Sequence, residues 1–488
     1  MLRNIRIVLA AVSITLVTLL FLDFTGTLHH WFGWLAKIQF LPALLALNAG
    51  VTAALVAITL LFGRVYCSLI CPLGIMQDIF ARFGRMRRKY RYSYSPALTV
   101  LRLVMLALMA ASIILGISAI VVLLAPYSAY GRIAGNLLAP VWMLGNNALA
   151  VVAERAESYA FYSVDVWLKS GLSIAVAAVT LIALGILSWK NGRTYCNTIC
   201  PVGTILGYLS RFSLLRPVID TSKCNACGLC ERNCKAACID SKQHKIDYTR
   251  CVACMNCIDT CRHGAISYTR RHSKTAGADP SQRRSFIATA AALGTTAALQ
   301  AQEKTVDGGL AAITDKQRPE RRTPIVPPGA KSIKHLSNHC TACQLCVAAC
   351  PNGVLRPSTD LTRLMQPESS YERGYCRPEC TRCSEVCPAG AITPVTREEK
   401  TAVQIGHAVW VADNCVPLTD GVECGNCARH CPAGAIQMVA SDPQDTDSPK
   451  IPVVNTARCI GCGACENLCP ARPFSAIYVE GYEKHRIN

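Results

Sequence analysis

The sequence predicts a mixed fold, in which a transmembrane bundle of four helices, arranged as two tandem helix pairs, precedes two cysteine-rich α+β domains. Two observations support this prediction. Hydrophobic residues make up 51% of the 488 residues and crowd into the part of the chain before position 190, whereas only 17% of the chain is charged. Most of the 29 cysteines follow that part, at short repeated spacings. A chain of this length and composition exceeds a single soluble domain.

Four apolar stretches are long enough, or nearly so, for the roughly 20 residues that a membrane span needs. They cover residues 7–22, 40–62, 98–124 and 172–189. Arg3, Arg64, Arg193 and the basic run 82–91 all lie on one side of such a bundle. The positive-inside rule therefore predicts that both ends of the bundle face the cytoplasm and that residues 23–39 and 125–171 are outward loops.

A motif of the form Arg-x-Tyr-Cys-x3-Cys-Pro-x-Gly occurs twice, at residues 64–74 and 193–203, which indicates a tandem repeat. Its four cysteines lie where the second and fourth apolar stretches end, and they are Cys67, Cys71, Cys196 and Cys200. Two such pairs could converge to form a redox or metal relay. The alternative is that each Cys-Pro turn ends a helix and the cysteine is an inert filler.

Two runs of the form C-x2-C-x2-C-x3-C follow the bundle, at residues 224–234 and 251–261. In bacterial two-cluster ferredoxins three cysteines of a run hold one cluster, and the fourth reaches the neighbouring cluster. The spacing therefore predicts one [4Fe-4S] cluster on Cys224, Cys227, Cys230 and Cys261, and a second on Cys251, Cys254, Cys257 and Cys234. The proline that usually follows the fourth cysteine is replaced by Lys235 and by Arg262.

Four further runs, each followed by proline, lie between residues 340 and 469. Proteins with four such runs commonly pair the first with the last and the second with the third. That pairing predicts four clusters: Cys340, Cys343, Cys346 with Cys469; Cys376, Cys380, Cys383 with Cys431; Cys415, Cys424, Cys427 with Cys387; and Cys459, Cys462, Cys465 with Cys350.

Zinc and disulfides are the alternatives for these 24 cysteines. A four-cysteine zinc site uses two separated pairs and has no need of a triple run. Cysteines three positions apart rarely meet the geometry of a disulfide. The runs therefore favour six [4Fe-4S] clusters, with iron as the metal. Cys238 falls outside the runs and is either a small buried hydrophobe or a substitute ligand.

These patterns divide the chain into a bundle (1–215), a two-cluster ferredoxin domain (216–270), a linker (271–338) and a four-cluster ferredoxin-like domain (339–488). Arg283 and Arg284 precede a short apolar stretch in the linker, and this segment is similar to a twin-arginine export signal. An ordinary basic linker with a peripheral helix is the alternative. A working signal would carry the last domain across the membrane.

Residues 1 to about 270 resemble the NapH family of membrane ferredoxins through the twin motif, the spans and the two-cluster runs. Residues about 281 to 488 resemble the NapG family of four-cluster periplasmic ferredoxins from nitrate reductase systems. The resemblance implies a multi-pass protein of the bacterial inner membrane, with a cytoplasmic first ferredoxin domain and a periplasmic last domain. It also implies oxidation of quinol and electron delivery to a reductase or cytochrome partner.

Two other functions are compatible with the same motifs. One is an assembly or maturation factor that reduces a metal or cofactor of another redox enzyme, and the other is a membrane anchor for a reductase. Whether the chain is itself an enzyme, as a quinol dehydrogenase subunit, is left open, and no catalytic residue is assigned. The net charge of +19 could suggest nucleic acid, but nothing resembles a nucleic-acid-binding motif. The densest basic run, at 82–91, directly follows an apolar segment and is interpreted as a membrane-proximal loop that contacts lipid, with a solvated basic face as the alternative.

Overall fold

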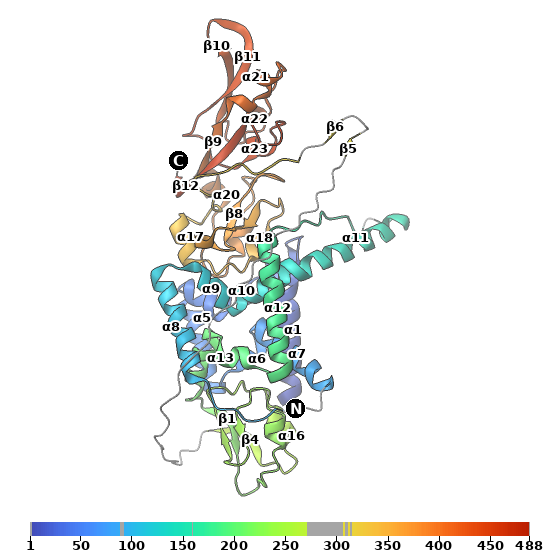
Figure 1. Ribbon diagram of the computed structural model, residues 1–488, viewed down its shortest axis with the longest axis vertical. Helices are drawn as coiled ribbons and strands as arrows, with labels where there is room; N and C mark the ends of the chain where they lie inside the picture. Colours follow the sequence, from blue (N-terminus) through green and yellow to red (C-terminus); the bar gives the residue numbers. More distant parts are fainter. Residues whose placement is uncertain are drawn as a thin grey trace.

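The computed structural model describes residues 2–87, 92–158, 160–270, 306–307, 311–312 and 315–487. The twin-arginine-like segment around Arg283 and Arg284 lies outside the described residues, so its role stays a prediction. Figure 1 shows an elongated molecule, with a helical region between two cysteine-rich α+β ends.

Three helical stretches in the described residues are long and apolar enough to cross a membrane. They are α1 (Leu2–Leu22), α12 (Gly171–Asn191) and the continuous stretch Pro126–Arg155. The helices α1 and α12 run along the long axis of the molecule (Figure 1). They confirm a continuous apolar helix of the expected length for two of the four expected spans.

The other two expected spans are broken. Residues 40–62 form α4 (Phe40–Leu45) and α5 (Ala49–Phe62), and the side chain of Asn48 caps the second helix. Residues 98–124 form α8 (Thr99–Leu115) and α9 (Ser118–Leu124), separated by Gly116 in the left-handed conformation. Hydropathy alone does not reveal these breaks, because the residues that make them lie inside uniformly apolar sequence.

The expected outward loop 125–171 is largely helical. It contains α10 (Pro126–Ile133), the π-helical turn η1 (Ala134–Leu138) and α11 (Ala139–Arg155). Its charged residues suggested a loop, but Arg132 is fully buried and donates a 2.9 Å hydrogen bond to the carbonyl of Val122. The helix α10 is buried, whereas α11 projects sideways from α1 and α12 (Figure 1).

Each copy of the twin motif folds in the same way. A left-handed glycine, Gly63 or Gly192, ends the preceding helix. A one-turn helix follows, α6 (Val65–Leu69) or α13 (Thr194–Thr198), and carries the first cysteine. A proline then starts the next helix, α7 (Pro72–Arg87) or α14 (Pro201–Ser210), directly after the second cysteine. Proline favours this first helical position because no intrahelical partner exists there for an N–H group.

The first α+β domain is closed by β1 (Leu215–Ile219), which pairs antiparallel with β4 (Ile266–Arg270). Between them lie α15 (Leu229–Arg232), the short pair β2 (Ile239–Asp240) and β3 (Lys245–Ile246), and α16 (Asn256–Thr260). The domain docks on the helical region through backbone hydrogen bonds from Leu214 to Leu60 (2.7 Å) and from Arg193 to Lys235 (2.8 Å).

The last domain occupies the opposite end of the molecule (Figure 1). Its first part contains α17 (Ile333–His339), α18 (Leu345–Ala349), the antiparallel pair β7 (Leu355–Pro357) and β8 (Pro367–Ser369), and α19 (Arg382–Glu385). Its second part contains two antiparallel strand pairs, β9 (Val403–Trp410) with β12 (Ile477–Ile487) and the hairpin of β10 (Ile436–Asp442) and β11 (Asp445–Val454). Its four short helices are α20 (Arg397–Ala402), α21 (Val416–Thr419), α22 (Asn426–Arg429) and α23 (Ala464–Asn467).

The Pro-rich segment 323–329, which the sequence analysis placed within the linker 271–338, is packed into this domain. Ile325 and Val326 are 1% and 0% exposed. Lys316 precedes the segment and donates hydrogen bonds of 2.7 to 2.9 Å to the carbonyls of Glu466, Asn467 and Cys469. The folded domain therefore begins well before residue 339.

Candidate metal centres

The structure places the eight cysteines of the first ferredoxin domain around two small cavities. Site 1 is the group Cys224, Cys227, Cys230 and Cys261, which line one cavity. Site 2 is the group Cys251, Cys254, Cys257 and Cys234, which line the other. In each site three cysteines come from one run and the fourth from the other run, as the spacing predicts for a two-cluster ferredoxin.

The backbone between the cysteines adopts left-handed conformations at matching positions of four runs. These residues are Ala226 and Gly228, Ala253 and Met255, Ala342 and Gln344, and Gly461 and Gly463, with φ between 48° and 78°. Left-handed non-glycine residues cost of order 1 kcal/mol or more and concentrate at ligand sites. Such turns form concavities lined by backbone N–H groups, which favour an anionic group such as a thiolate-bound iron–sulfur cluster.

The last domain pairs its runs differently from the expectation. The structure forms four sites: site 3 (Cys340, Cys343, Cys346, Cys387), site 4 (Cys376, Cys380, Cys383, Cys350), site 5 (Cys415, Cys424, Cys427, Cys469) and site 6 (Cys459, Cys462, Cys465, Cys431). The four cysteines of site 5 line a separate cavity. In the other three, the fourth thiol lies close enough to interact electrostatically with thiols of its site.

The predicted first-with-last and second-with-third pairing was therefore wrong. The first two runs pack together against the helical region, in one hydrophobic cluster with α1 and α10 residues. The last two runs share a separate core with β9, β10 and β12. Each neighbouring pair of runs thus forms its own two-site unit, because the two runs of a pair share one core.

Two lysines, the buried Lys400 and the half-buried Lys316, hold the backbone of these sites, and the sequence analysis did not single them out. Lys400 donates 2.5 Å hydrogen bonds to the carbonyls of Arg377 and Cys380 in site 4. Lys316 holds the carbonyl of Cys469 in site 5. Burial lowers the pKa of Lys316 to about 8. No local pattern marks either lysine, because both reach their partners only after the domain has folded.

Cys67, Cys71, Cys196 and Cys200 converge in the helical region, and we call this group the tetrad. All four are buried, with 3% or 4% of each residue exposed. Each thiol lies within electrostatic range of others from both halves of the repeat. The Nε2 amide of Gln77 donates a 3.2 Å hydrogen bond to the Cys196 sulfur, and the Gly203 N–H lies 3.4 Å from the Cys200 sulfur.

The two halves of the repeat hold the tetrad by exchanging arginine contacts. Arg64 donates to the carbonyl of Cys196 at 3.2 Å, and Arg193 donates to the carbonyl of Cys67 at 2.7 Å. A Cβ atom at Gly203 would overlap the Cys196 carbonyl oxygen. The same holds for Gly74 and the Cys67 carbonyl oxygen. The arginine and glycine of the motif are thus explained by one packing arrangement.

All four donors of the tetrad are thiols. Among the described residues no three histidine, cysteine or carboxylate side chains stand close enough together to hold one ion. Tetrahedral zinc needs sulfurs about 2.3 Å from a shared centre. More widely spaced thiols suit a multi-iron cluster, and all the donors are the soft sulfur that iron–sulfur clusters take.

Two family descriptions match separate parts of the chain. Residues 46–91 and 170–219 match a 4Fe-4S binding domain, and these segments contain both halves of the tetrad. Residues 250–354 and 421–472 match a 4Fe-4S dicluster domain. The methylamine utilization ferredoxin-type protein MauM of Paracoccus denitrificans is 32% identical over 170 residues, which are 33% of this chain and 73% of that protein. The chain belongs to the ferredoxin-type iron–sulfur proteins.

Two further relatives of this ferredoxin-type chain are matched over less of their length than MauM is. The protein YccM of Escherichia coli is 23% identical over 227 residues, which are 45% of this chain and 55% of that protein. An uncharacterized protein of Methanocaldococcus jannaschii is 33% identical over 100 residues, which are 20% of this chain and 39% of that protein. No solved structure matches the chain.

Cys238 lies in the same cavity as site 2 of the ferredoxin-type chain. Its sulfur is 3.5 Å from that of Cys234, and its thiol also bonds the side chain of Cys251. The hydrogen bond from Cys238 lowers the pKa of Cys234 to about 7. Cys238 is therefore a thiol donor next to two candidate ligands, a role that the sequence analysis did not consider.

Proposed function

We propose that the chain is a membrane-bound electron relay that takes electrons from quinol and delivers them to a reductase or cytochrome partner. Sites 1 to 6 hold six [4Fe-4S] clusters, and the tetrad holds a seventh. A bound cluster supplies one-electron transfer at a potential that its surroundings set. The proposal joins a NapH-like membrane half to a NapG-like half in one chain, with site 1 on the cytoplasmic side and site 5 on the periplasmic side.

The observation that carries the proposal is the order of the seven cysteine groups along the molecule. At one end, site 2 touches the tetrad region directly. The Arg193 N–H donates to the carbonyl of Lys235 at 2.8 Å, and the Asn197 amide donates to the carbonyl of Ala236 at 3.3 Å. Lys235 and Ala236 follow Cys234 of site 2, while Arg193 and Asn197 flank Cys196 of the tetrad.

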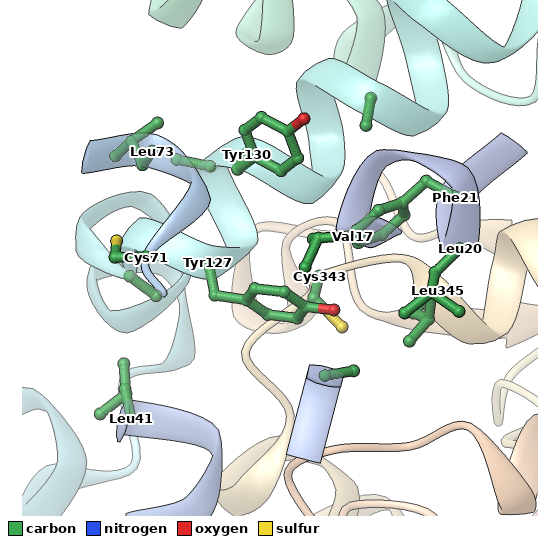
Figure 2. Packing of buried hydrophobic residues seen from close by; sticks show 14 of the residues in the cluster. Val17, Leu20, Phe21, Leu41, Cys71, Leu73, Tyr127, Tyr130, Cys343 and Leu345 are labelled. Carbon is green, nitrogen blue, oxygen red and sulfur yellow. The ribbon is translucent and has the colours of Figure 1, made fainter. Parts of the chain in front are cut away.

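On its other side the tetrad faces site 3 through buried aromatic side chains. Figure 2 shows the ring of Tyr127 reaching from the side of Cys71 toward the thiol of Cys343. Tyr127 interacts electrostatically with Cys343, and Tyr195 does so with Cys200. The backbone of Gly131 packs so closely on the Cys343 carbonyl that a Cβ atom there would overlap it. Site 3 therefore lies against the buried helix α10.

The remaining sites continue the line away from the helices. Cys350 belongs to the first run of the last domain but completes site 4, and Cys387 belongs to the second run but completes site 3, so these two sites are neighbours. The Cys376 N–H of site 4 donates to the carbonyl of Cys462 in site 6 at 2.9 Å. Sites 5 and 6 are neighbours for the same reason, because Cys469 of the last run completes site 5 and Cys431 of the preceding run completes site 6. An unbroken series of this kind suits transfer between the two faces of a membrane.

The test is the double variant Cys71→Ser with Cys200→Ser, because serine keeps the size of cysteine but is a poor soft-metal ligand. Seven cubane clusters correspond to roughly 28 iron atoms per chain, and we expect the variant to keep roughly 24. Reduction by a quinol analogue should stop, whereas dithionite should still reduce the remaining sites. Cys238→Ser serves as the control for iron content alone, since it replaces a buried thiol outside the seven cysteine groups, although this thiol contacts Cys234 and Cys251 of site 2.

Two results would contradict the proposal. Purified protein that carries zinc with little iron would remove the cluster assignment altogether. A double variant with unchanged iron and unchanged quinol-driven reduction would show that the Cys-Pro pairs only end helices.

A further inference from the structure

A cavity of about 570 Å³ opens where the N-terminal end of α1 meets α7 and the first ferredoxin domain. Figure 1 shows these three parts close together near the N terminus. None of the seven cysteine groups lines this cavity. The sequence analysis interpreted the basic run 82–91 as a membrane-proximal loop and did not predict a cavity there.

Cations dominate the polar lining of the cavity. Arg3 and Arg6 come from α1, Arg82 and Arg85 from α7, and Lys235 from the ferredoxin domain. The Nε atoms of Arg3 and Arg6 are buried and have no hydrogen-bond partner. Within the described part of the chain, Arg82 and Arg85 form no ion pair.

The single acid in the lining, Asp78, does not balance this charge. Its carboxylate already pairs with Arg193 (2.6 Å), Lys235 (2.5 Å) and Arg6 (3.1 Å). Burial alone would raise the pKa of Asp78, but Arg193 and Lys235 outweigh it and hold the pKa well below its usual range. The acid is therefore saturated. Arg3 pairs with Asp259, which lies outside the lining, so Arg82 and Arg85 are the lining arginines that remain available to an external anion.

Further along the same two helices, α1 and α7, the lining of the cavity is apolar. Ile7, Ala10 and Ile14 line it from α1, and Ile75 and Ile79 line it from α7. Because α1 has the length and hydropathy of a membrane span, this apolar lining continues into the surface that would face lipid tails. The cavity thus offers a cationic region and an apolar region to the same molecule.

We propose that the cavity binds an anionic phospholipid, whose headgroup lies among the arginines and whose acyl chains lie along α1 and α7. Basic pockets between membrane helices on the cytoplasmic side suit anionic headgroups. A neutral quinol headgroup would leave the free guanidinium groups of Arg82 and Arg85 without a counter-charge. A phosphate bridges α1, α7 and Lys235, and so holds the ferredoxin domain on the membrane. This proposal does not depend on the redox function.

Native mass spectrometry of the full chain in detergent tests the proposal, with phosphatidylglycerol and phosphatidylcholine of identical acyl chains as probes. We expect the chain to retain phosphatidylglycerol in preference to phosphatidylcholine. The variant Arg82→Gln with Arg85→Gln should bind phosphatidylglycerol about thirtyfold more weakly, since two basic residues near a headgroup contribute about 2 kcal/mol together and about 1.4 kcal/mol is a factor of ten. Arg82→Lys with Arg85→Lys should retain most of the binding, because both charges remain.

The matched control is Lys190→Gln with Arg211→Gln, which removes two exposed charges outside the cavity. It should leave phosphatidylglycerol binding unchanged. Equal binding of the two lipids would overturn the proposal, and so would equal losses in the cavity and control variants. Displacement of bound lipid by a short-chain quinone, with no dependence on headgroup charge, would assign the cavity to quinone instead.

Discussion

Arg193 donates a 2.7 Å hydrogen bond to the backbone carbonyl of Cys67, although the two residues belong to different halves of the repeat. Arg64 makes the reciprocal contact to Cys196. Arg193 also pairs with Asp78 at 2.6 Å, and its side chain is fully buried. One arginine therefore joins the tetrad, the α7 helix and the second half of the repeat.

Replacing Arg193 with glutamine should destabilise the helical region by about 3 kcal/mol, because a buried charge loses its partner. A lower thermal midpoint of the detergent-solubilised protein and a loss of iron from the tetrad would show this. Arg193→Lys keeps the positive charge but loses the planar guanidinium group, which can bond several acceptors at once, so we expect an intermediate loss of stability. A glutamine variant that is as stable as the wild type would show that Arg6 and Lys235 suffice for Asp78.

The pairing of the last four runs can be tested by thiol alkylation of the iron-loaded protein. In Cys469→Ser, site 5 loses its fourth ligand, so Cys415, Cys424 and Cys427 should become reactive. Peptide mass spectrometry then identifies the alkylated cysteines. Alkylation of Cys340, Cys343 and Cys346 in this variant would support the first-with-last pairing. As a reciprocal control, Cys387→Ser should expose those three thiols and leave site 5 protected.

Cys238→Ala should make the midpoint potential of site 2 more negative. The variant removes a hydrogen bond to the sulfur of Cys234, and hydrogen bonds to ligand sulfurs raise cluster potentials by stabilising the more negative reduced state. A redox titration monitored by electron paramagnetic resonance measures the shift. Cys238→Ser retains a donor and should shift the potential less. Loss of iron from Cys238→Ala would instead identify Cys238 as a ligand.

The pairing of β9 with β12 should weaken as the pH falls. Burial lowers the pKa of His485 on β12 to about 4, although a backbone contact to Val326 opposes the shift. The unfolded chain, with a histidine pKa of about 6.5, therefore binds the proton better. The stabilisation is present above pH 6.5 and is lost progressively toward pH 4.

This loss should reach about 2 kcal/mol between pH 7 and pH 5, because one pKa unit corresponds to about 1.4 kcal/mol. Hydrogen–deuterium exchange of β9 and β12 at the two pH values measures the local opening energy. His485→Gln does not titrate and should flatten the pH dependence. If His485→Gln shows the same pH dependence as the wild type, the pH dependence arises from another titratable group.

Hydropathy predicted α1 and α12 correctly, because each is a continuous apolar helix. It did not predict the breaks between α4 and α5 or between α8 and α9. Those breaks depend on Asn48 as a helix cap and on Gly116 in the left-handed conformation, both of which look unremarkable within apolar sequence. The buried Arg132 made the helix α10 look like a charged loop.

The sequence by itself determined which three cysteines belong to each site, because a run of about ten residues wraps around its own centre and the spacing is a local property. It also determined the repeat that makes the tetrad, since each copy carries its own arginine, cysteines, proline and glycine. Only the tertiary structure decided the fourth thiol of sites 3 to 6. All four runs offer an equivalent last cysteine, so the choice depends on which runs pack together. The shared cores of neighbouring runs made that choice.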